Sequence, residues 1–181
     1  MTKKKHSANK YSNRNENFVT SEEIEKVDLY LENFQYRDYF SFLCKLRPNQ
    51  KDEKLEVIDE TDADDFNVDK RSGLVYLFVL DGKILKVGST ITPFVKRVQS
   101  YNTGKTRYRI AGKNSTTNYF CLQSFLKLGK VIDVYAFFPE TEAADIFGTV
   151  MDVEPNPKHW ERKILAALAE EGRKPVLCTQ R

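Results

Sequence analysis

The chain has 181 residues, of which 40% are hydrophobic and 12% aromatic, and its net charge is +3. This composition excludes a disordered protein, and the length allows one domain with appendages. No segment approaches the roughly 20 apolar residues of a membrane-spanning helix, and the basic start lacks the apolar stretch of a secretory signal. Three scattered cysteines without a CxxC pair indicate reduced thiols. We therefore expect a cytoplasmic protein without a membrane association.

The first part of the chain is expected to form an arm and a helical extension. Residues 1–20 are polar and basic without apolar periodicity, which predicts a flexible basic arm. Ser21 is followed by several glutamates, a pattern typical of a helix start. Apolar and aromatic residues then continue as far as Leu43, which predicts one long or two short helices. With the loop that follows, the helical extension covers residues 21–72.

Charge is strongly segregated along the chain. Residues 51–71 hold nine acids against four bases, and we expect an acidic loop with a short strand at Leu55–Ile58. From Gly82 to Ile132 there are ten Lys or Arg residues and no acid. A basic stretch free of acids is typical of a protein that binds a polyanion such as DNA, although a solvated charged face is the alternative.

Residues 73–181 are expected to form the core, because apolar runs alternate there with turn and capping residues. The order of elements is β-β-α-α-β-α, which predicts an α/β fold with α+β layers and a small, mostly antiparallel sheet. The expected elements are strands at 74–79, 83–87 and 131–138, helices at 92–101, 115–128 and 158–171, and an insertion at 139–157.

The hairpin between the first two of these strands decides whether Tyr76 and Lys86 share a face. A two-residue turn at Asp81-Gly82 would place them on opposite faces, because strand side chains alternate. A three-residue loop that begins at Leu80, with Gly82 left-handed, would place them directly opposite each other on one face. We predict the three-residue loop.

Three further residues are candidates for a phosphate site. Arg97 and Tyr101 are four residues apart on the expected helix and so share a face, and arginine offers a planar fork of donors to phosphate. On the last helix, Glu161 falls within the apolar arc that runs from Trp160 to Leu165, at about 100° per residue. A carboxylate there must be paired, protonated or bound to a cation. Because no His or Cys cluster is present, a lone carboxylate with phosphate oxygens indicates Mg²⁺.

These motifs resemble the GIY-YIG nuclease superfamily over about residues 73–172. The segment Gly73–Tyr76 stands at the first half-motif and Lys86–Gly88 at the second, where lysine replaces the usual tyrosine. The runs KRVQSYN, STTNYF, VYAFFPE and KPVLCTQ are similar to compact type II restriction endonucleases of this superfamily. At least one of these resembles the chain in carrying that lysine; it recognises TCNGA and has a histidine where this chain has Ser89.

The resemblance implies hydrolysis of phosphodiester bonds in double-stranded DNA, with a single Mg²⁺ on Glu161 that Mn²⁺ could replace. Arg97 would neutralise the phosphate, Tyr76 would position the attacking water, and Tyr101 would orient the phosphate or Arg97. Lys86, its pKa lowered by the metal and Arg97, would remove a proton from the water directly or through Tyr76. The alternatives for Lys86 are that Tyr76 is the base or that the lysine adds only positive potential.

Recognition of DNA is expected to come from loops and a helix start near this site, by phosphate contacts more than by base readout. Cutting both strands of a near-palindrome calls for a homodimer, and a restriction enzyme works beside a cognate DNA methyltransferase. The other readings are a repair or homing nuclease of the superfamily and a non-catalytic DNA-binding module. The candidate DNA contacts are Arg107, Arg109, Lys113, Ser115, Thr116, Thr117 and Asn118.

Overall fold

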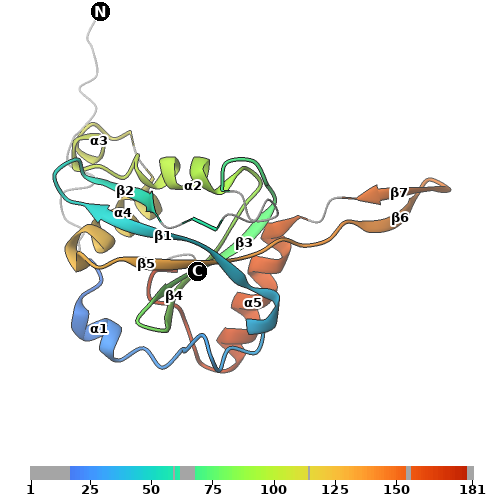
Figure 1. The fold of residues 1–181 in the computed structure, drawn as a ribbon, viewed down its shortest axis with the longest axis horizontal. Helices are drawn as coiled ribbons and strands as arrows, with labels where there is room; N and C mark the ends of the chain where they lie inside the picture. Colours follow the sequence, from blue (N-terminus) through green and yellow to red (C-terminus); the bar gives the residue numbers. More distant parts are fainter. Residues whose placement is uncertain (1–16, 59, 62–67, 114, 154–155, 179–181) are drawn as a thin grey trace, which may run out of the picture.

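A computed structural model describes residues 17–58, 60–61, 68–113, 115–153 and 156–178 (Figure 1). Its centre is a five-stranded antiparallel sheet with the strand order β2-β1-β5-β3-β4. The α+β class and the antiparallel sheet predicted above are therefore confirmed. The five strands are β1 (Ser41–Asn49), β2 (Lys54–Ile58), β3 (Leu74–Leu80), β4 (Lys83–Thr90) and β5 (Ile132–Phe137).

Helices cover both faces of this sheet, and a separate two-stranded hairpin projects from the body of the molecule (Figure 1). No helix among the described residues is long and apolar enough to cross a membrane. The helices are α1 (Ser21–Glu25), the 3-10 turn η2 (Arg37–Tyr39), α2 (Phe94–Tyr101), α3 (Thr106–Ile110), α4 (Thr116–Leu128) and α5 (Pro157–Glu170), and the hairpin strands are β6 (Glu142–Ile146) and β7 (Thr149–Val153).

The central strands are buried on both faces, which divides the core into two layers. All seven residues of β3 are buried, as expected for a strand between two layers. Tyr76 and Phe78 face α2 and α4, in a cluster that also contains Phe94. The alternate residues of β3 face α5, whose Ile164 and Leu168 lie in the second cluster. Side chains on opposite faces of β3 and β4 therefore meet different helices.

The helix ends follow the capping signals in the sequence. Ser115 caps α4 by accepting a hydrogen bond from the backbone of Asn118, and Gly129 ends the helix in a left-handed conformation with φ +65°. Asn156 caps α5, and Pro157 occupies its first turn. The positions predicted for these two helices are confirmed. Helix α3 was not predicted, and neither was the β6–β7 hairpin, which lies inside the expected insertion.

The extended helices predicted for the first part of the chain are wrong. The only α-helix there in the described residues is α1, and residues 41–49 form β1, which pairs with β5 inside the main sheet. The buried Leu29 and Leu31 lie in irregular chain beside β4: the amide of Leu31 donates to the carbonyl of Gly82, and Leu29 accepts from the amide of Ile84. This run of apolar residues was predicted to be helical, although its members cover a strand edge.

The predicted arm at residues 1–20 is only partly within the described chain, because residues 1–16 lie outside it. The rest does not behave as an arm. Val19 is 3% exposed, and its amide donates a hydrogen bond to the hydroxyl of Ser124 on α4. The ring of Phe18 packs edge-on against Tyr119 at 5.6 Å. Residues 17–20 therefore belong to the packed body.

Candidate active site

A pocket of about 240 Å³ lies at the end of β4 and is lined by four of the five predicted catalytic residues, Tyr76, Lys86, Arg97 and Glu161. It is reached by groups from β3, β4, α2 and α5, which are far apart in the sequence. Tyr101, the fifth, does not line the pocket but is hydrogen-bonded to Tyr76 and Arg97, which do. The lining residues used below are Tyr76, Lys86, Gly88, Ser89, Arg97, Thr117, Lys158, Glu161 and Cys178.

The β3–β4 hairpin places Tyr76 and Lys86 on one face, but not by the predicted three-residue loop. Leu80 pairs with Lys83 across a two-residue turn at Asp81-Gly82, whose φ values of 50° and 78° are both positive, as in a type I′ turn. The predicted loop is therefore wrong. A bulge beyond Phe78 instead leaves one extra residue in β4, so that Lys86 pairs with Phe78 rather than with Tyr76. The extra residue restores the shared face, because it shifts the alternation by one.

Tyr76, Arg97 and Tyr101 form a buried hydrogen-bonded triad. The two phenol oxygens lie 2.6 Å apart. Arg97 donates from Nε to Tyr76 at 3.0 Å and from Nη2 to Tyr101 at 3.2 Å, and its guanidinium lies 4.4 Å from the centre of the Tyr101 ring. Both tyrosines are fully buried, and burial raises the pKa of each phenol. Both are therefore neutral at pH 7, and Arg97 keeps its charge.

Gly88 allows the ring of Tyr76 to lie across β4. Tyr76 pairs directly with Gly88, and a Cβ placed on Gly88 would stand 2.5 Å from Cζ and from the hydroxyl oxygen of Tyr76. Atoms at that distance overlap, so only glycine fits opposite this tyrosine. Gly88 also lines the pocket, so no side chain of β4 fills the pocket at this position.

Lys86 is 6% exposed, and its Nζ donates a hydrogen bond to the carbonyl of Leu177 at 3.3 Å. Burial opposes the charged form, but the anionic forms of Cys121 and Tyr76, among its neighbours, favour it, and the net shift of the Lys86 pKa is upward. The lowering of this pKa by a bound metal stays a prediction, and Arg97 acts in the predicted direction. Lys86 is a cation at neutral pH.

Glu161 reaches the pocket from the other layer of the molecule. It is half-buried on α5, and its carboxylate accepts a hydrogen bond from the hydroxyl of Ser89. Ser89 pairs with Val75, whose side chain belongs to the α5 side of the sheet. Glu161 therefore approaches β4 from the face opposite to Tyr76, and both residues line the same pocket at the edge of the sheet.

The oxygen atoms of Glu161 and Ser89 suit a hard cation. In the described part of the chain, no three His, Cys, Asp or Glu residues gather into a ready-made metal cage. Mg²⁺ is commonly held by one or two carboxylates with substrate phosphates and water completing its octahedron. A single carboxylate in a pocket that also contains Lys86 and Arg97 fits that mode of binding, because the two cations can hold the phosphate.

Two predicted DNA contacts, Arg107 and Arg109, lie on the short helix α3. Arg107 is exposed and stacks over the ring of Tyr108 at 4.7 Å, and Arg109 lies over the ring of Tyr119 at 5.1 Å. Lys113 is exposed after the helix. These three cations lie outside the pocket, and a role in DNA binding stays a prediction for each.

The other predicted DNA contacts lie at the start of α4. Ser115 caps the helix, and Asn118 donates from its amide to the carbonyl and hydroxyl oxygens of Ser100, which ties α4 to α2. Thr116 accepts from Arg109 at 3.5 Å. Thr117 alone of this group lines the pocket. The contacts of Ser115 and Asn118 hold helices in place, which argues against base readout by those two side chains.

Sequence reasoning missed two residues of the pocket, Lys158 and Cys178. Lys158 lies three residues before Glu161 on α5, so the helical spacing that identified the glutamate also pointed to this lysine. Cys178 reaches the pocket because the end of the chain runs along β4, where Leu177 donates from its amide to the carbonyl of Leu85. No local pattern in the sequence signals that contact.

Two solved structures are similar to this chain. The restriction endonuclease HPY188I, in complex with product DNA, is 41% identical with a TM-score of 0.67, and the match covers 94% of this chain and 98% of that chain. A mutant of bacteriophage T4 EndoII is 11% identical with a TM-score of 0.50, covering 80% of this chain and 96% of that chain, and shows a shared fold alone. No family model matches, and neither does any curated protein.

Proposed function

The chain belongs to the family of the restriction endonuclease HPY188I, and from this premise we propose that it is a type II enzyme that hydrolyses double-stranded DNA at a short pseudo-palindromic site, such as TCNGA. One observation carries the proposal: Tyr76, Lys86, Arg97 and Glu161 line one pocket although they come from different elements. Phosphate chemistry needs fixed cations, a positioned water and a charge-neutralising group, and these side chains offer each. The same set supports placing the chain in the GIY-YIG superfamily.

Glu161 is the residue that would hold a divalent cation, either Mg²⁺ or Mn²⁺ in its place. Such an ion, when bound, supplies Lewis-acid stabilisation of the charge on the leaving 3′ oxygen. Ser89 keeps one carboxylate oxygen of Glu161 hydrogen-bonded, so the other remains for the cation. A single ion is the economical number, because the pocket contains one carboxylate.

Arg97 neutralises the charge that grows on the phosphate oxygens. Two of its nitrogens are already oriented by Tyr76 and Tyr101, so little side-chain freedom is lost when the phosphate binds. Tyr101 acts through Arg97 and positions it. Tyr76 reaches the pocket from β3, where its hydroxyl can orient the attacking water.

The proton of that water passes to Tyr76 or to Lys86. Both carry protons at neutral pH, so whichever is the base must first give its own proton to solvent. Lys86 otherwise serves as a fixed cation that favours the phenolate form of its neighbour, which lowers the pKa of Tyr76 against the effect of burial. Substitution of each residue distinguishes the two assignments.

Cutting both strands of a pseudo-palindrome requires two active sites, so we propose a two-fold homodimer. The exposed cations Arg107 and Lys113, with Arg109, are proposed to contact phosphates flanking the cut. A cognate DNA methyltransferase would protect the host DNA, and the pair would work in the cytoplasm.

Incubation of the protein with plasmid DNA and Mg²⁺ tests the proposal directly. Discrete fragments are expected, and sequencing their ends gives the recognition site and the cut position. A smear would indicate a nonspecific nuclease of the repair or homing kind. A gel shift without cutting, over a range of Mg²⁺ and Mn²⁺ concentrations, would replace the proposal with a non-catalytic DNA-binding role.

A further inference from the structure

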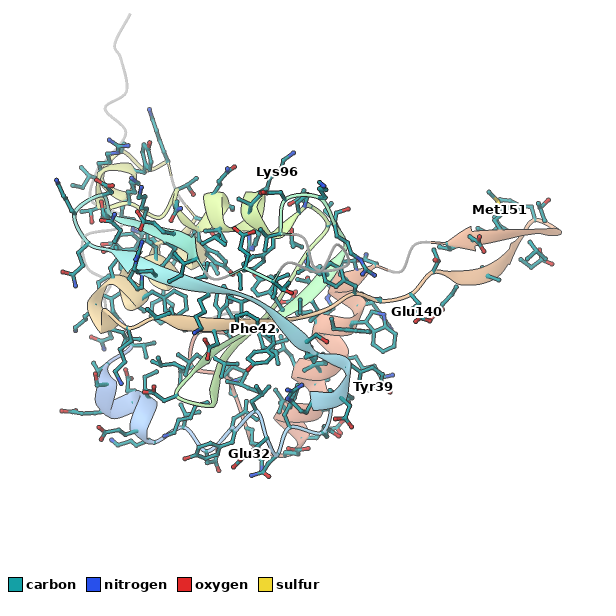
Figure 2. All side chains as sticks on the ribbon, in the orientation of Figure 1. Glu32, Tyr39, Phe42, Lys96, Glu140 and Met151 are labelled. Carbon is teal, nitrogen blue, oxygen red and sulfur yellow. The ribbon has the colours of Figure 1, made fainter. Side chains whose placement is uncertain are left out.

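Lys158 is a third cation of the pocket, and the proposed function gives it no role. It lies in the first turn of α5, where Asn156 accepts a hydrogen bond from its backbone amide at 3.0 Å and so fixes the start of the helix. Lys158 lines the pocket together with Lys86 and Arg97. Lys96, beside Arg97 in the sequence, lies instead on the outer side of α2 (Figure 2). Lys158 is thus brought to the site by the fold, although it is distant from both other cations in the sequence.

The positive charge of the pocket exceeds what one phosphate can balance. Lys86 and Arg97 already hold the phosphate that is cut, and the single carboxylate of Glu161 is offset by the divalent ion that it would bind. Lys158 is exposed, and within the described part of the chain no hydrogen bond or ion pair engages its ammonium. A further anion would satisfy it. DNA supplies one, because each strand carries a phosphate about every 3.4 Å along the helix axis.

A cleft continues from the pocket past Lys158. The cleft has a volume of about 770 Å³, and Lys158 lines both it and the pocket. Arg162 follows four residues later on the same face of α5 and is a second exposed cation of the cleft. These two fixed cations face one acid there, Glu142. A DNA strand that leaves the pocket over Lys158 would therefore enter a cleft that favours its phosphates.

The position of Lys158 on α5 decides which neighbouring phosphate it reaches. Glu161 lies about one helical turn further along, so the two side chains share a face of the helix. Under the proposed function, the ion on Glu161 stabilises the leaving 3′ oxygen, whereas Tyr76 and Lys86 act on the attacking water from the other face of the sheet. The leaving side of the cut strand therefore lies over α5. The first phosphate on that side is the one immediately 5′ of the cut.

We propose that Lys158 binds the phosphate immediately 5′ of the cut, and that the strand continues from there along the cleft toward Arg162. This inference deepens the proposed function and rests on it. The nucleotide that keeps the 3′ oxygen is then held at two points, by the ion and by the ammonium of Lys158, which keeps that oxygen aligned with the bond that breaks. Lys158 touches the substrate and takes no part in proton transfer.

A DNA duplex with one neutral phosphate tests the contact, once sequencing of plasmid fragments has mapped the cut. A methylphosphonate immediately 5′ of the cut removes the charge that Lys158 would bind, and it should lower kcat/KM of the unmodified protein about 10–100-fold. Lys158→Ala should lower kcat/KM on natural DNA by a similar factor. On the methylphosphonate duplex the two proteins should cut equally fast, because each change removes the same contact. Losses that multiply would overturn the inference.

Lys163→Ala is the matched control. This exposed lysine lies on the same helix, stacks over the ring of Trp160 at 4.9 Å and faces a separate cleft that contains Tyr39 and Phe137. Its kcat/KM on natural DNA should stay near that of the unmodified protein, and it should keep the full sensitivity to the methylphosphonate. Lys158→Arg, which retains the charge, should recover most of the activity lost in Lys158→Ala.

Two further measurements separate a phosphate contact from an effect on Glu161. Lys158→Ala should reduce the slope of log affinity against log salt concentration by about 0.9, the value for one phosphate. The Mg²⁺ concentration for half-maximal cutting at saturating DNA should not change. A shifted Mg²⁺ response with an unchanged salt slope would show that the lysine acts through Glu161, and would overturn the inference.

The side of the cut has its own test. A methylphosphonate immediately 3′ of the cut should slow the unmodified protein and Lys158→Ala by the same factor; a loss confined to the unmodified protein would place Lys158 on the wrong side. Failure of the inference differs from failure of the proposed function. A protein that cuts DNA while Lys158→Ala behaves like Lys163→Ala refutes the inference alone, and an unmodified protein that cuts no DNA refutes both.

Discussion

The ring of Tyr76 lies across Gly88 so closely that a Cβ at position 88 would stand 2.5 Å from Cζ and from the hydroxyl oxygen. Overpacking of this kind costs about 1–3 kcal/mol, because the ring or the strand must move. Gly88→Ala is therefore expected to lower the melting temperature and to abolish cutting, since the Tyr76 hydroxyl leaves Arg97. Thermal unfolding and plasmid digestion measure the two effects. A Gly88→Ala variant with unchanged stability and full activity would contradict the close approach.

Glu161→Gln should abolish cutting and leave DNA affinity intact. The amide keeps the shape of the side chain and loses the negative charge that would hold a cation, and a loss of at least about 100-fold in rate is expected. Glu170→Gln is the control, because this exposed glutamate lies at the far end of the same helix. Gel shift and single-turnover digestion are the measurements. Stabilisation of the protein by Mg²⁺ in thermal unfolding should disappear only in the Glu161 variant.

Ser89→Ala should weaken the response to metal rather than the binding of DNA. The hydroxyl of Ser89 fixes the Glu161 carboxylate, and loss of such a partner commonly costs about 10–100-fold in metal affinity. We expect the Mg²⁺ concentration for half-maximal cutting to rise by that order. Ser89→Thr, which keeps a hydroxyl, should restore most of the response. Equal metal curves for the alanine variant and the unmodified protein would remove Ser89 from this role.

The pH dependence of cutting identifies the general base. Burial raises the pKa of Tyr76, and the pKa of Lys86 is also raised, so the base form of either residue is scarce at neutral pH. Below its pKa that form increases tenfold per pH unit, so the single-turnover rate should rise with pH between 6 and 9, with a slope of about one on a logarithmic scale. Tyr76→Phe should flatten this slope if Tyr76 is the base, and Lys86→Met should do so if Lys86 is. A rate that falls as pH rises would exclude both.

The helices of the core could be predicted because their ends carry local signals. Ser115 and Gly129 bound α4, and Asn156 with Pro157 opens α5, so capping alone located the helix that carries Glu161. Arg97 and Tyr101 were expected to be neighbours from their spacing of four residues, and Arg97 does donate a hydrogen bond to Tyr101 within the triad. Site residues that are brought together by helical spacing could therefore be predicted from the sequence.

The register of the β3–β4 hairpin was harder to predict, because the effects of the turn and of a bulge on which residues share a face can cancel. The turn contains Asp81 and Gly82 only, which by itself would separate Tyr76 from Lys86, and the bulge at Leu85 brings them back to one face. A bulge is chosen by packing, and Leu85 is fully buried in the α2 and α4 layer. No residue type in this stretch announces it, so the shared face could be inferred while its cause could not.

The start of the chain was misassigned for a related reason. Leu29, Leu31 and Phe34 belong to an apolar run that follows a helix-start signal, yet they are buried because they cover α5 and the outer edge of β4. An apolar run indicates that a segment is buried, but the element that it packs against decides whether its backbone is helical or irregular. That partner lies more than 50 residues further along the chain at Gly82 and Ile84.

The position of β4 at the margin of the sheet determines what the pocket can contain. If β4 were an interior strand, the backbones of its neighbours would separate Arg97 on one face of the sheet from Glu161 on the other. A single phosphate could then not touch both side chains. At the edge of the sheet, groups from both faces meet beside Gly88, which has no side chain. A substrate there can be bound from both faces at once. A further strand paired with β4 at Gly88 would restore that barrier, and the protein would then be inactive with all of its proposed catalytic side chains intact.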